Sequence, residues 1–148
     1  ILYHIDEENG VYYAGQRDLA LEEVATGRII SIDYKTSEVI RYESFYNQVL
    51  KGKEYLKGSF DFLEACNYNS YTVQLNLYKY MDAINNPKSK EKVDAGLYDM
   101  YICQITENGY SMIKVDDIDL NYCKKTCEFI SDKPKNQKEE SIKRFFLG

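Results

Sequence analysis

Hydrophobic positions in the first third of the chain follow the pattern of β-strands. Short β-branched or aromatic runs occupy residues 11–14, 18–21 and 28–35, and turn residues separate them. Thr26-Gly27 is a turn signal between the last two runs, so we predict that these pair as antiparallel neighbours. The run 28–35 is rich in isoleucine, and we predict that it forms a central strand.

The best helical pattern covers residues 71–84. Its apolar side chains recur at the 3.6-residue period of an amphipathic helix: Val73, Leu77, Met81 and Ile84. Asn69 or Ser70 is suited to cap the start of this helix. Pro87 predicts its end, because proline cannot continue the hydrogen-bond ladder.

The second half of the chain adds two strands and a helix. Residues 97–105 and 110–115 are strand-like, and Asn108-Gly109 between them is a hairpin turn signal. Residues 118–130 form an amphipathic helical pattern. The order β-β-β-α-β-β, with a last helix, predicts an α/β protein whose central mixed β-sheet is flanked by helices.

The remaining segments carry no clear period. Residues 37–69 predict a solvated connecting segment with a short helix over 43–50, and residues 131–148 predict a polar C-terminal tail or short helix. We expect residues 1–130 to form a single domain, since 148 residues are about one domain's worth of chain. The chain opens at Ile1 rather than at a methionine, so we expect an N-terminal element to be missing.

Composition narrows the class of protein. The net charge of −5 argues against non-specific, charge-driven binding of nucleic acid over a large surface. No apolar run is long enough to span a membrane, and no signal peptide is visible. The four cysteines are then expected to be reduced thiols in the cytoplasm.

Asp18 and Asp33 are candidate ligands of a divalent cation. A phosphodiester is anionic and hydrolyses slowly, and carboxylates that hold Mg²⁺ or Mn²⁺ can shield its charge and activate water. Residues i and i+2 of a strand point to one face, so Lys35 is placed beside Asp33. Asp33-Tyr34-Lys35 is the only acidic-x-lysine triplet in the chain, and taken alone it also fits an ion pair at a strand end.

Three motifs in order carry a resemblance to a known family. They are Gly15-Gln16-Arg17-Asp18, Ile32-Asp33-Tyr34-Lys35-Thr36, and Tyr71-x-x-Gln74-Leu75-x-Leu77-Tyr78. This set resembles the PD-(D/E)XK nuclease superfamily, and within it the RecB-like or phage-type exonuclease branch. The resemblance covers residues 11–115 and implies a restriction-endonuclease-like core.

The resemblance also implies roles for single residues. Asp18, Asp33 and the carbonyl of Tyr34 would hold Mg²⁺ or Mn²⁺, and Lys35 would be the catalytic lysine. Gln74 and Tyr78 would support the site and contact DNA near the cleaved phosphate. These two residues lie one helical turn apart on one face of the predicted helix.

The resemblance also makes Thr36, the last residue of the second motif, a candidate contact to the phosphate backbone. Further DNA contacts are expected outside the motifs. The segment 37–69 mixes basic with aromatic residues, and it can be interpreted either as a solvated connection or as a flap that holds a nucleic-acid strand. Its candidate contacts are Arg41, Lys51, Lys53 and Lys57.

The expected function is metal-dependent hydrolysis of DNA phosphodiester bonds in recombination, repair or genome processing of a phage or virus. Such a protein would act in the host cytoplasm, bind DNA, and work with a recombination or replication protein. Two alternatives stay open: a nucleic-acid-binding scaffold on a decayed nuclease fold, and an RNA endonuclease with the same metal chemistry.

Overall fold

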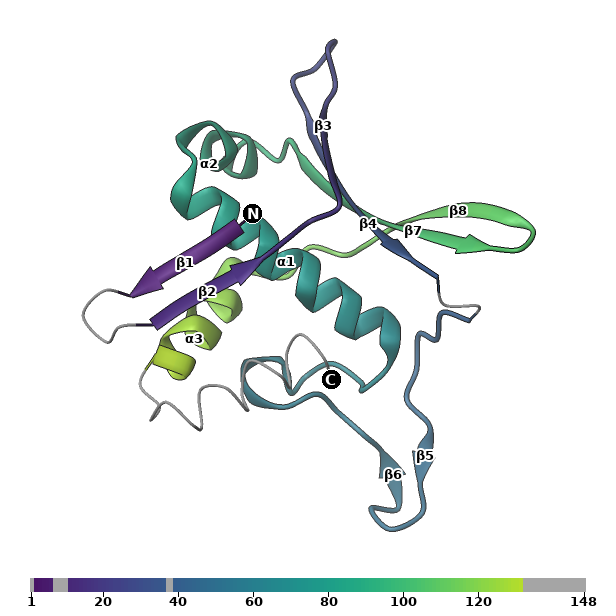
Figure 1. Ribbon diagram of the computed structural model, residues 1–148. Helices are drawn as coiled ribbons and strands as arrows, with labels where there is room; N and C mark the ends of the chain where they lie inside the picture. The colour runs from purple at the N-terminus through teal and green to yellow at the C-terminus, as the bar shows by residue number, and fades with distance from the viewer. Residues whose placement is uncertain (1, 7–10, 37–38, 132–148) are drawn as a thin grey trace.

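A mixed β-sheet and one long helix organise this α/β protein (Figure 1). The computed structural model describes residues 2–6, 11–36 and 39–131. The strands are β1 (Leu2–Asp6), β2 (Val11–Gly15), β3 (Leu19–Glu22), β4 (Ile29–Lys35), β5 (Tyr46–Asn47), β6 (Gly52–Lys53), β7 (Tyr98–Thr106) and β8 (Gly109–Lys114). The helices are α1 (Asn67–Asn85), α2 (Pro87–Asp94) and α3 (Leu120–Ser131), and η1 (Gly58–Phe60) is a 3₁₀ turn.

The main sheet has the strand order β3-β4-β7-β8. β3 and β4 are antiparallel, as are β7 and β8, whereas β4 and β7 run parallel. Parallel neighbours require a long crossover, and here the crossover carries the β5–β6 hairpin, α1 and α2. The structure thus confirms a mixed sheet in which the predicted strand 28–35 is central.

Alternation along β4 and β7 decides which side chains meet α1. The register pairs Ser31 with Met100 and Asp33 with Ile102, so these residues share one face of the sheet. All four side chains are buried on the face that α1 covers. The opposite face carries no helix within the described residues, so the predicted helical cover holds for one face of the sheet.

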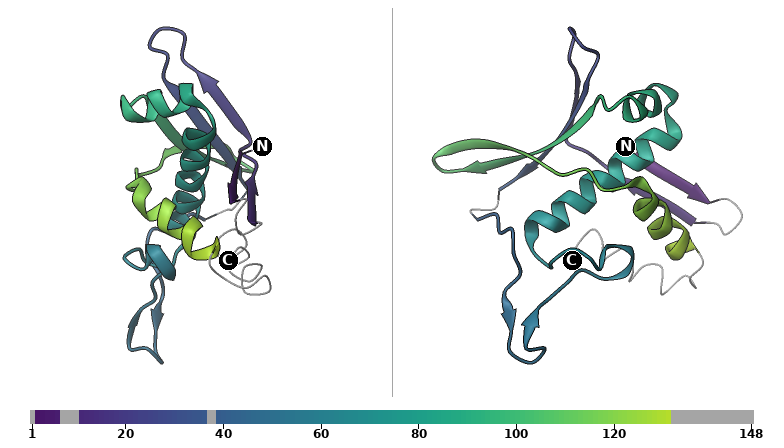
Figure 2. Two further views of the ribbon diagram at one scale, coloured as in Figure 1. Left: turned by 90° about the vertical axis from the view of Figure 1, so that its left-hand side faces the viewer. Right: turned by 180° about the vertical axis from the view of Figure 1, so that it is seen from behind.

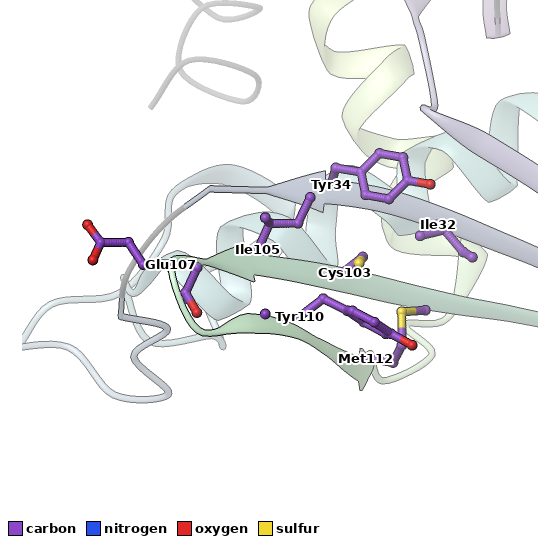
Figure 3. A pocket seen from close by; sticks show the side chains of 9 residues that line it. Ile32, Tyr34, Cys103, Ile105, Glu107, Tyr110 and Met112 are labelled. Carbon is purple, nitrogen blue, oxygen red and sulfur yellow. The ribbon is translucent and has the colours of Figure 1, made fainter.

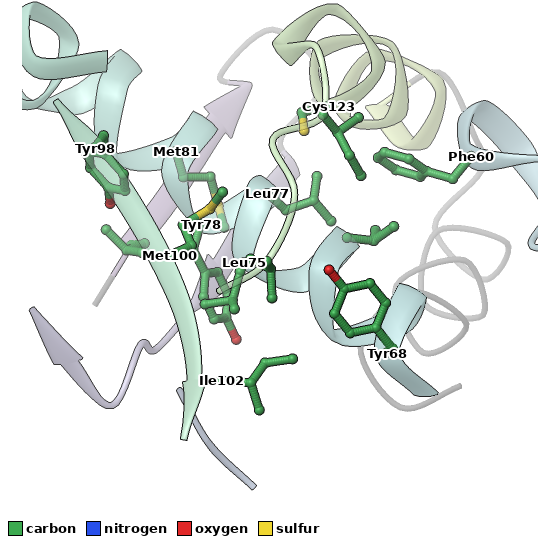
Figure 4. Close-up of a cluster of buried hydrophobic side chains, with 14 of the residues drawn as sticks. Phe60, Tyr68, Leu75, Leu77, Tyr78, Met81, Tyr98, Met100, Ile102 and Cys123 are labelled. Carbon is green, nitrogen blue, oxygen red and sulfur yellow. The ribbon is translucent and has the colours of Figure 1, made fainter. Parts of the chain in front are cut away.

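Helix α1 runs through the centre of the molecule, with the sheet on one side and α3 and the β1–β2 ribbon on others (Figures 1 and 2). It is therefore buried on several sides rather than along one stripe. Val73, Leu77 and Met81 are buried as predicted, but Ile84 is exposed. The core extends from α1 to β7 through Met100 and Ile102, and to η1 and α3 through Phe60 and Cys123 (Figure 4). All four cysteines are free and buried.

The ends of α1 differ from the sequence prediction. The helix begins at Asn67, and Cys66 rather than Asn69 or Ser70 occupies the cap position. Ser70 Oγ instead donates to the Cys66 carbonyl at 3.1 Å. Pro87 does end the ladder, but it also starts α2 at once, because a proline is well accommodated in the first turn of a helix and Asn86 caps that turn.

The connecting segment before α1 is a projecting arm, residues 39–66, that contains the β5–β6 hairpin (Figures 1 and 2). The helix predicted over 43–50 is wrong. Asn47 Oδ1 accepts hydrogen bonds from the backbone N–H groups of Val49 and Leu50 at 2.9 and 3.1 Å, which turns the chain instead of continuing a helix. Lys51 then adopts a left-handed φ of 51° before Gly52.

The other sequence-derived elements agree with the structure. The predicted strands 97–105 and 110–115 correspond to β7 and β8, and the helix 118–130 corresponds to α3. The tail predicted over 131–148 lies outside the described residues, apart from the last residue of α3. No described helix is both long and apolar enough to cross a membrane.

Candidate functional site

Three separate segments bring the predicted site residues together. Asp18 lies immediately before β3, Asp33 and Lys35 lie in the last three residues of β4, and Gln74 and Tyr78 lie on α1. The alternation of β4 points Asp33 and Lys35 toward α1. The helical spacing of four then places Gln74 and Tyr78 on a common face.

The Lys35 ammonium is held by partners on both elements. Its Nζ lies 2.6 Å from Asp33 Oδ2 and donates to Gln74 Oε1 at 3.0 Å. The same Nζ lies 4.6 Å from the centroid of the Tyr71 ring, within the range of a cation–π contact. Gln74 Nε2 in turn donates to the Tyr78 hydroxyl at 2.8 Å. The lysine therefore has one defined position, which α1 supports.

The two aspartates differ in exposure. Asp18 is exposed, and its Oδ2 accepts the Tyr34 N–H at 2.7 Å. Asp33 is only 4% exposed. Burial raises the pKa of Asp33, the Lys35 ammonium opposes part of that rise, and the nearby Asp18 carboxylate adds to it. A buried carboxylate next to a second carboxylate is an arrangement that a cation would stabilise.

The donor atoms fit a hard divalent cation. Asp33 Oδ2 is buried and makes no well-aligned hydrogen bond to a described residue, although the Lys35 ammonium is close. The N–H and C=O of one strand residue point to the same side, so the Tyr34 carbonyl faces the edge at which Asp18 lies. No group of three carboxylate, histidine or thiol side chains suited to a metal occurs among the described residues. The candidate ligands are thus two carboxylates and one main-chain carbonyl, all of them oxygen donors.

Tyr78 is fixed by close packing against β2. A Cβ atom on Gly15 would lie 2.2 Å from Tyr78 Cε1, so only glycine allows this approach. Burial raises the pKa of the Tyr78 phenol, which therefore stays protonated at neutral pH. The glycine of the first motif thus positions the tyrosine of the third.

A buried cluster next to the site was not predicted from the sequence. Arg17 Nη1 donates to Asp82 Oδ2 at 2.7 Å and to the Tyr98 hydroxyl at 2.6 Å, and the Tyr98 hydroxyl donates to Asp82 at 2.9 Å. These bonds attach the segment that carries Asp18 to both α1 and β7. The available signal was the spacing of Gln74, Tyr78 and Asp82, which puts three polar side chains on one face of the helix.

The predicted DNA contacts differ in how they are engaged. Thr36 is exposed directly after β4, and Lys51 and Lys57 are exposed on the arm. Lys53 Nζ is engaged by Glu43 at 2.9 Å and by Glu64 at 3.0 Å. The Arg41 guanidinium lies over the Phe45 ring, 4.3 Å from its centroid. Lys51 in the hairpin turn therefore has no ion-pair partner among the described residues, whereas Lys53 in the hairpin stem is paired with Glu43 and Glu64.

The other face of the sheet has a shallow apolar hollow of about 590 Å³. Ile32 and Tyr34 of β4 line it together with Cys103, Ile105, Tyr110 and Met112 of β7 and β8 (Figure 3). Asp33 and Lys35 point to the opposite face of β4, so this hollow is not part of the carboxylate–lysine site.

Three comparisons with known proteins were negative. No protein-family model, no curated protein and no solved structure matches this chain. The resemblance to PD-(D/E)XK nucleases therefore stays a prediction from the three motifs, and the site is interpreted from its own geometry.

Proposed function

We propose that this protein is a Mg²⁺- or Mn²⁺-dependent nuclease of the PD-(D/E)XK type that hydrolyses DNA phosphodiester bonds. The observation that carries the proposal is the position of Lys35. Its ammonium lies between the buried Asp33 carboxylate and Gln74, on the side of β4 that α1 covers. Asp18, immediately before β3, accepts the Tyr34 N–H at the same end of β4.

Each part of the site has a chemical task in this proposal. A cation held by Asp18, Asp33 and the Tyr34 carbonyl would supply positive charge to the phosphodiester and acidify a water. Lys35 donates hydrogen bonds to the attacking water and to the phosphoryl oxygens as charge develops there. Gln74 holds the ammonium in place, and Tyr78 holds Gln74.

The wider role of the proposed nuclease follows the motif resemblance. Its RecB-like branch favours DNA as the substrate and recombination, repair or genome processing as the setting, with a recombination or replication protein as partner. RNA cleavage uses the same metal chemistry, so labelled DNA and RNA belong in one assay.

Removing either charged group should abolish cleavage. We expect Asp33→Asn and Lys35→Ala each to lower Mn²⁺- or Mg²⁺-dependent cleavage of end-labelled and circular DNA by at least about 100-fold. The matched controls are Asp61→Asn and Lys124→Ala. Asp61 directly follows η1 and Lys124 lies on α3, and both side chains are exposed, so these variants should cleave DNA like the wild type. Circular dichroism checks that all four variants fold.

Two outcomes would contradict the proposal. Cleavage that survives in Lys35→Ala or Asp33→Asn at the wild-type rate would show that the site is not catalytic. Calorimetry that detects no Mn²⁺ binding, together with no cleavage by the wild type, would instead favour a scaffold on the same fold.

A further inference from the structure

A second concavity lies on the arm side of the candidate site. It has a volume of about 410 Å³, in the range of small-ligand sites, and lies between the base of the arm and the first turns of α1. Its walls include two aromatic rings, a guanidinium and polar side chains: Arg41, Glu43, Phe45, Asn67, Ser70 and Tyr71.

This pocket is adjacent to the catalytic lysine. Tyr71 lines the pocket, and its ring also lies 4.6 Å from Lys35 Nζ. One aromatic side chain therefore separates the pocket from the proposed point of cleavage. A strand whose phosphate sits beside Lys35 would bring its neighbouring nucleotide to this pocket.

The pocket offers an aromatic ring backed by a cation. The Arg41 guanidinium lies over the Phe45 ring, and Arg41 forms no ion pair with any residue that the structure describes. Glu43, the acidic group of the pocket, shares the Lys53 ammonium with Glu64, at 2.9 Å and 3.0 Å, so its charge is offset in part. Phe45 is 70% exposed, so its ring is accessible to a ligand.

The position of Arg41 is defined by α1. Asn67 Oδ1 accepts the Arg41 N–H at 2.7 Å, and Asn67 Nδ2 donates to the Val39 carbonyl at 2.8 Å. The arm base is thereby attached to the first turn of the helix that also carries Gln74. Helix α1 thus positions both the stacking platform, which is the Phe45 ring with the Arg41 guanidinium, and the proposed catalytic lysine.

We propose that this pocket binds an unpaired nucleobase of the strand being cut, next to the cleaved phosphate. Proteins bind unpaired bases by stacking them on aromatic rings and arginine planes, and the faces of a base in a duplex are already occupied. The inference rests on the proposed nuclease function, and it adds a substrate class: single strands or frayed ends rather than intact duplex.

Two neighbouring aromatic residues provide the test. Phe45→Ala removes the platform, while Tyr46→Ala removes a ring of similar exposure, 65%, that does not line the pocket. Binding of a fluorescent single-stranded oligodeoxynucleotide is measured by anisotropy in EDTA, where no cutting occurs. We expect Phe45→Ala to raise the dissociation constant about tenfold. Phe45→Tyr keeps an aromatic ring and should bind like the wild type, and so should Tyr46→Ala.

An abasic scan of the oligonucleotide sharpens the test. In the wild type, removal of one base should weaken binding as much as Phe45→Ala does, and in Phe45→Ala the same removal should have no further effect. Equal binding by the wild type and Phe45→Ala, equal weakening by Phe45→Ala and Tyr46→Ala, or preference for intact duplex would overturn the inference. A wild type that binds no oligonucleotide would also overturn it.

A substrate without any base separates this inference from the proposed function. An oligodeoxynucleotide made only of abasic residues has no ring to stack on Phe45, so Phe45→Ala should hydrolyse it with Mn²⁺ at the wild-type rate. Oligonucleotide binding that depends on Phe45, without hydrolysis by the wild type, would support the pocket and contradict the nuclease. Hydrolysis without any dependence of binding on Phe45 would support the nuclease and contradict the pocket.

Discussion

Asp33 carries the least favourable charge of the site. It is a buried carboxylate at the end of a central strand, and burial raises its pKa from the ordinary value of 3.8 despite the Lys35 ammonium at 2.6 Å. A carboxylate whose pKa is raised by folding binds its proton more tightly in the folded state than in the unfolded state. Its ionisation therefore lowers the free energy of unfolding.

The sign of this effect predicts how stability depends on pH. Below a pH of 3.8 Asp33 is protonated in both states, and the destabilisation develops as the pH rises through the raised, folded-state pKa. We expect Asp33→Asn to have a higher Tm than the wild type at neutral pH, with the difference disappearing in acid. Mn²⁺ should raise the Tm of the wild type but not that of Asp33→Asn, because the cation offsets the buried charge.

Thermal unfolding followed by circular dichroism from about pH 4 to about pH 8 checks this prediction. Asp61→Asn is the control, because Asp61 is exposed and its curve should follow that of the wild type. A difference between Asp33→Asn and wild type that is constant over the whole range would show that Asp33 ionises as freely in the folded chain as in the unfolded one.

At the scale of elements, the contact between β2 and α1 is closest at Gly15. A Cβ atom added to Gly15 would lie only 2.2 Å from Tyr78 Cε1. The Tyr78 hydroxyl accepts a hydrogen bond from Gln74, and Gln74 accepts one from Lys35. A substitution in β2 is thus connected to Lys35, the proposed catalytic lysine, through two side chains of α1.

Gly15→Ala should therefore lower both stability and activity. Overpacking of this kind costs about 1–3 kcal/mol, and we expect cleavage to fall more than tenfold because Gln74 is displaced. Gly52→Ala is the matched control, since the nearest atom to its added Cβ is the Leu50 carbonyl oxygen at 4.0 Å. Urea unfolding and the cleavage assay measure the two effects, and equal behaviour of the two variants would contradict the proposed path from β2 to Lys35.

Local sequence signals predicted most elements, and the exceptions have local or tertiary causes. The strands β4, β7 and β8 and the body of α1 follow their hydrophobic periods. The expected helix over 43–50 failed because the Asn47 side chain competes for backbone N–H groups. The first residues of α1 were missed because Asn67, a weak helix former, is held by backbone groups at the start of the arm, 26 and 28 residues earlier in the chain.

At the scale of the whole molecule, basic charge is local rather than spread over a face. The chain has a net charge of −5, and within the arm four basic residues (Arg41, Lys51, Lys53, Lys57) are balanced by four acidic ones (Glu43, Glu54, Asp61, Glu64). Lys53 is used inside the arm, and Lys51 and Lys57 remain exposed. We expect few phosphate contacts and a shallow dependence of binding on salt.

The salt dependence of DNA binding distinguishes Lys51 and Lys57, which have no ion-pair partner within the described ranges, from Lys53, which has two. Replacing Lys51 and Lys57 together by glutamine should flatten the slope of log affinity for single-stranded DNA against log salt by up to about 0.7 per lost contact. Lys53→Gln should leave that slope unchanged, because the Lys53 ammonium is already ion-paired with Glu43 and Glu64. Anisotropy titrations at several salt concentrations measure the slopes, and the reverse ranking would exclude Lys51 and Lys57 as phosphate contacts.

The sequence by itself determined the strands and helices with regular period, the neighbouring placement of Asp33 and Lys35, and the face shared by Gln74 and Tyr78. These properties depend on alternation and helical pitch, which act over a few residues. Only the tertiary structure decided that β4 and β7 are parallel neighbours, that Arg17 is bound by Asp82 and Tyr98, and that the arm and α1 enclose a pocket beside Lys35. Those contacts join residues tens of positions apart, and they form only when the buried surfaces of the whole chain pack together.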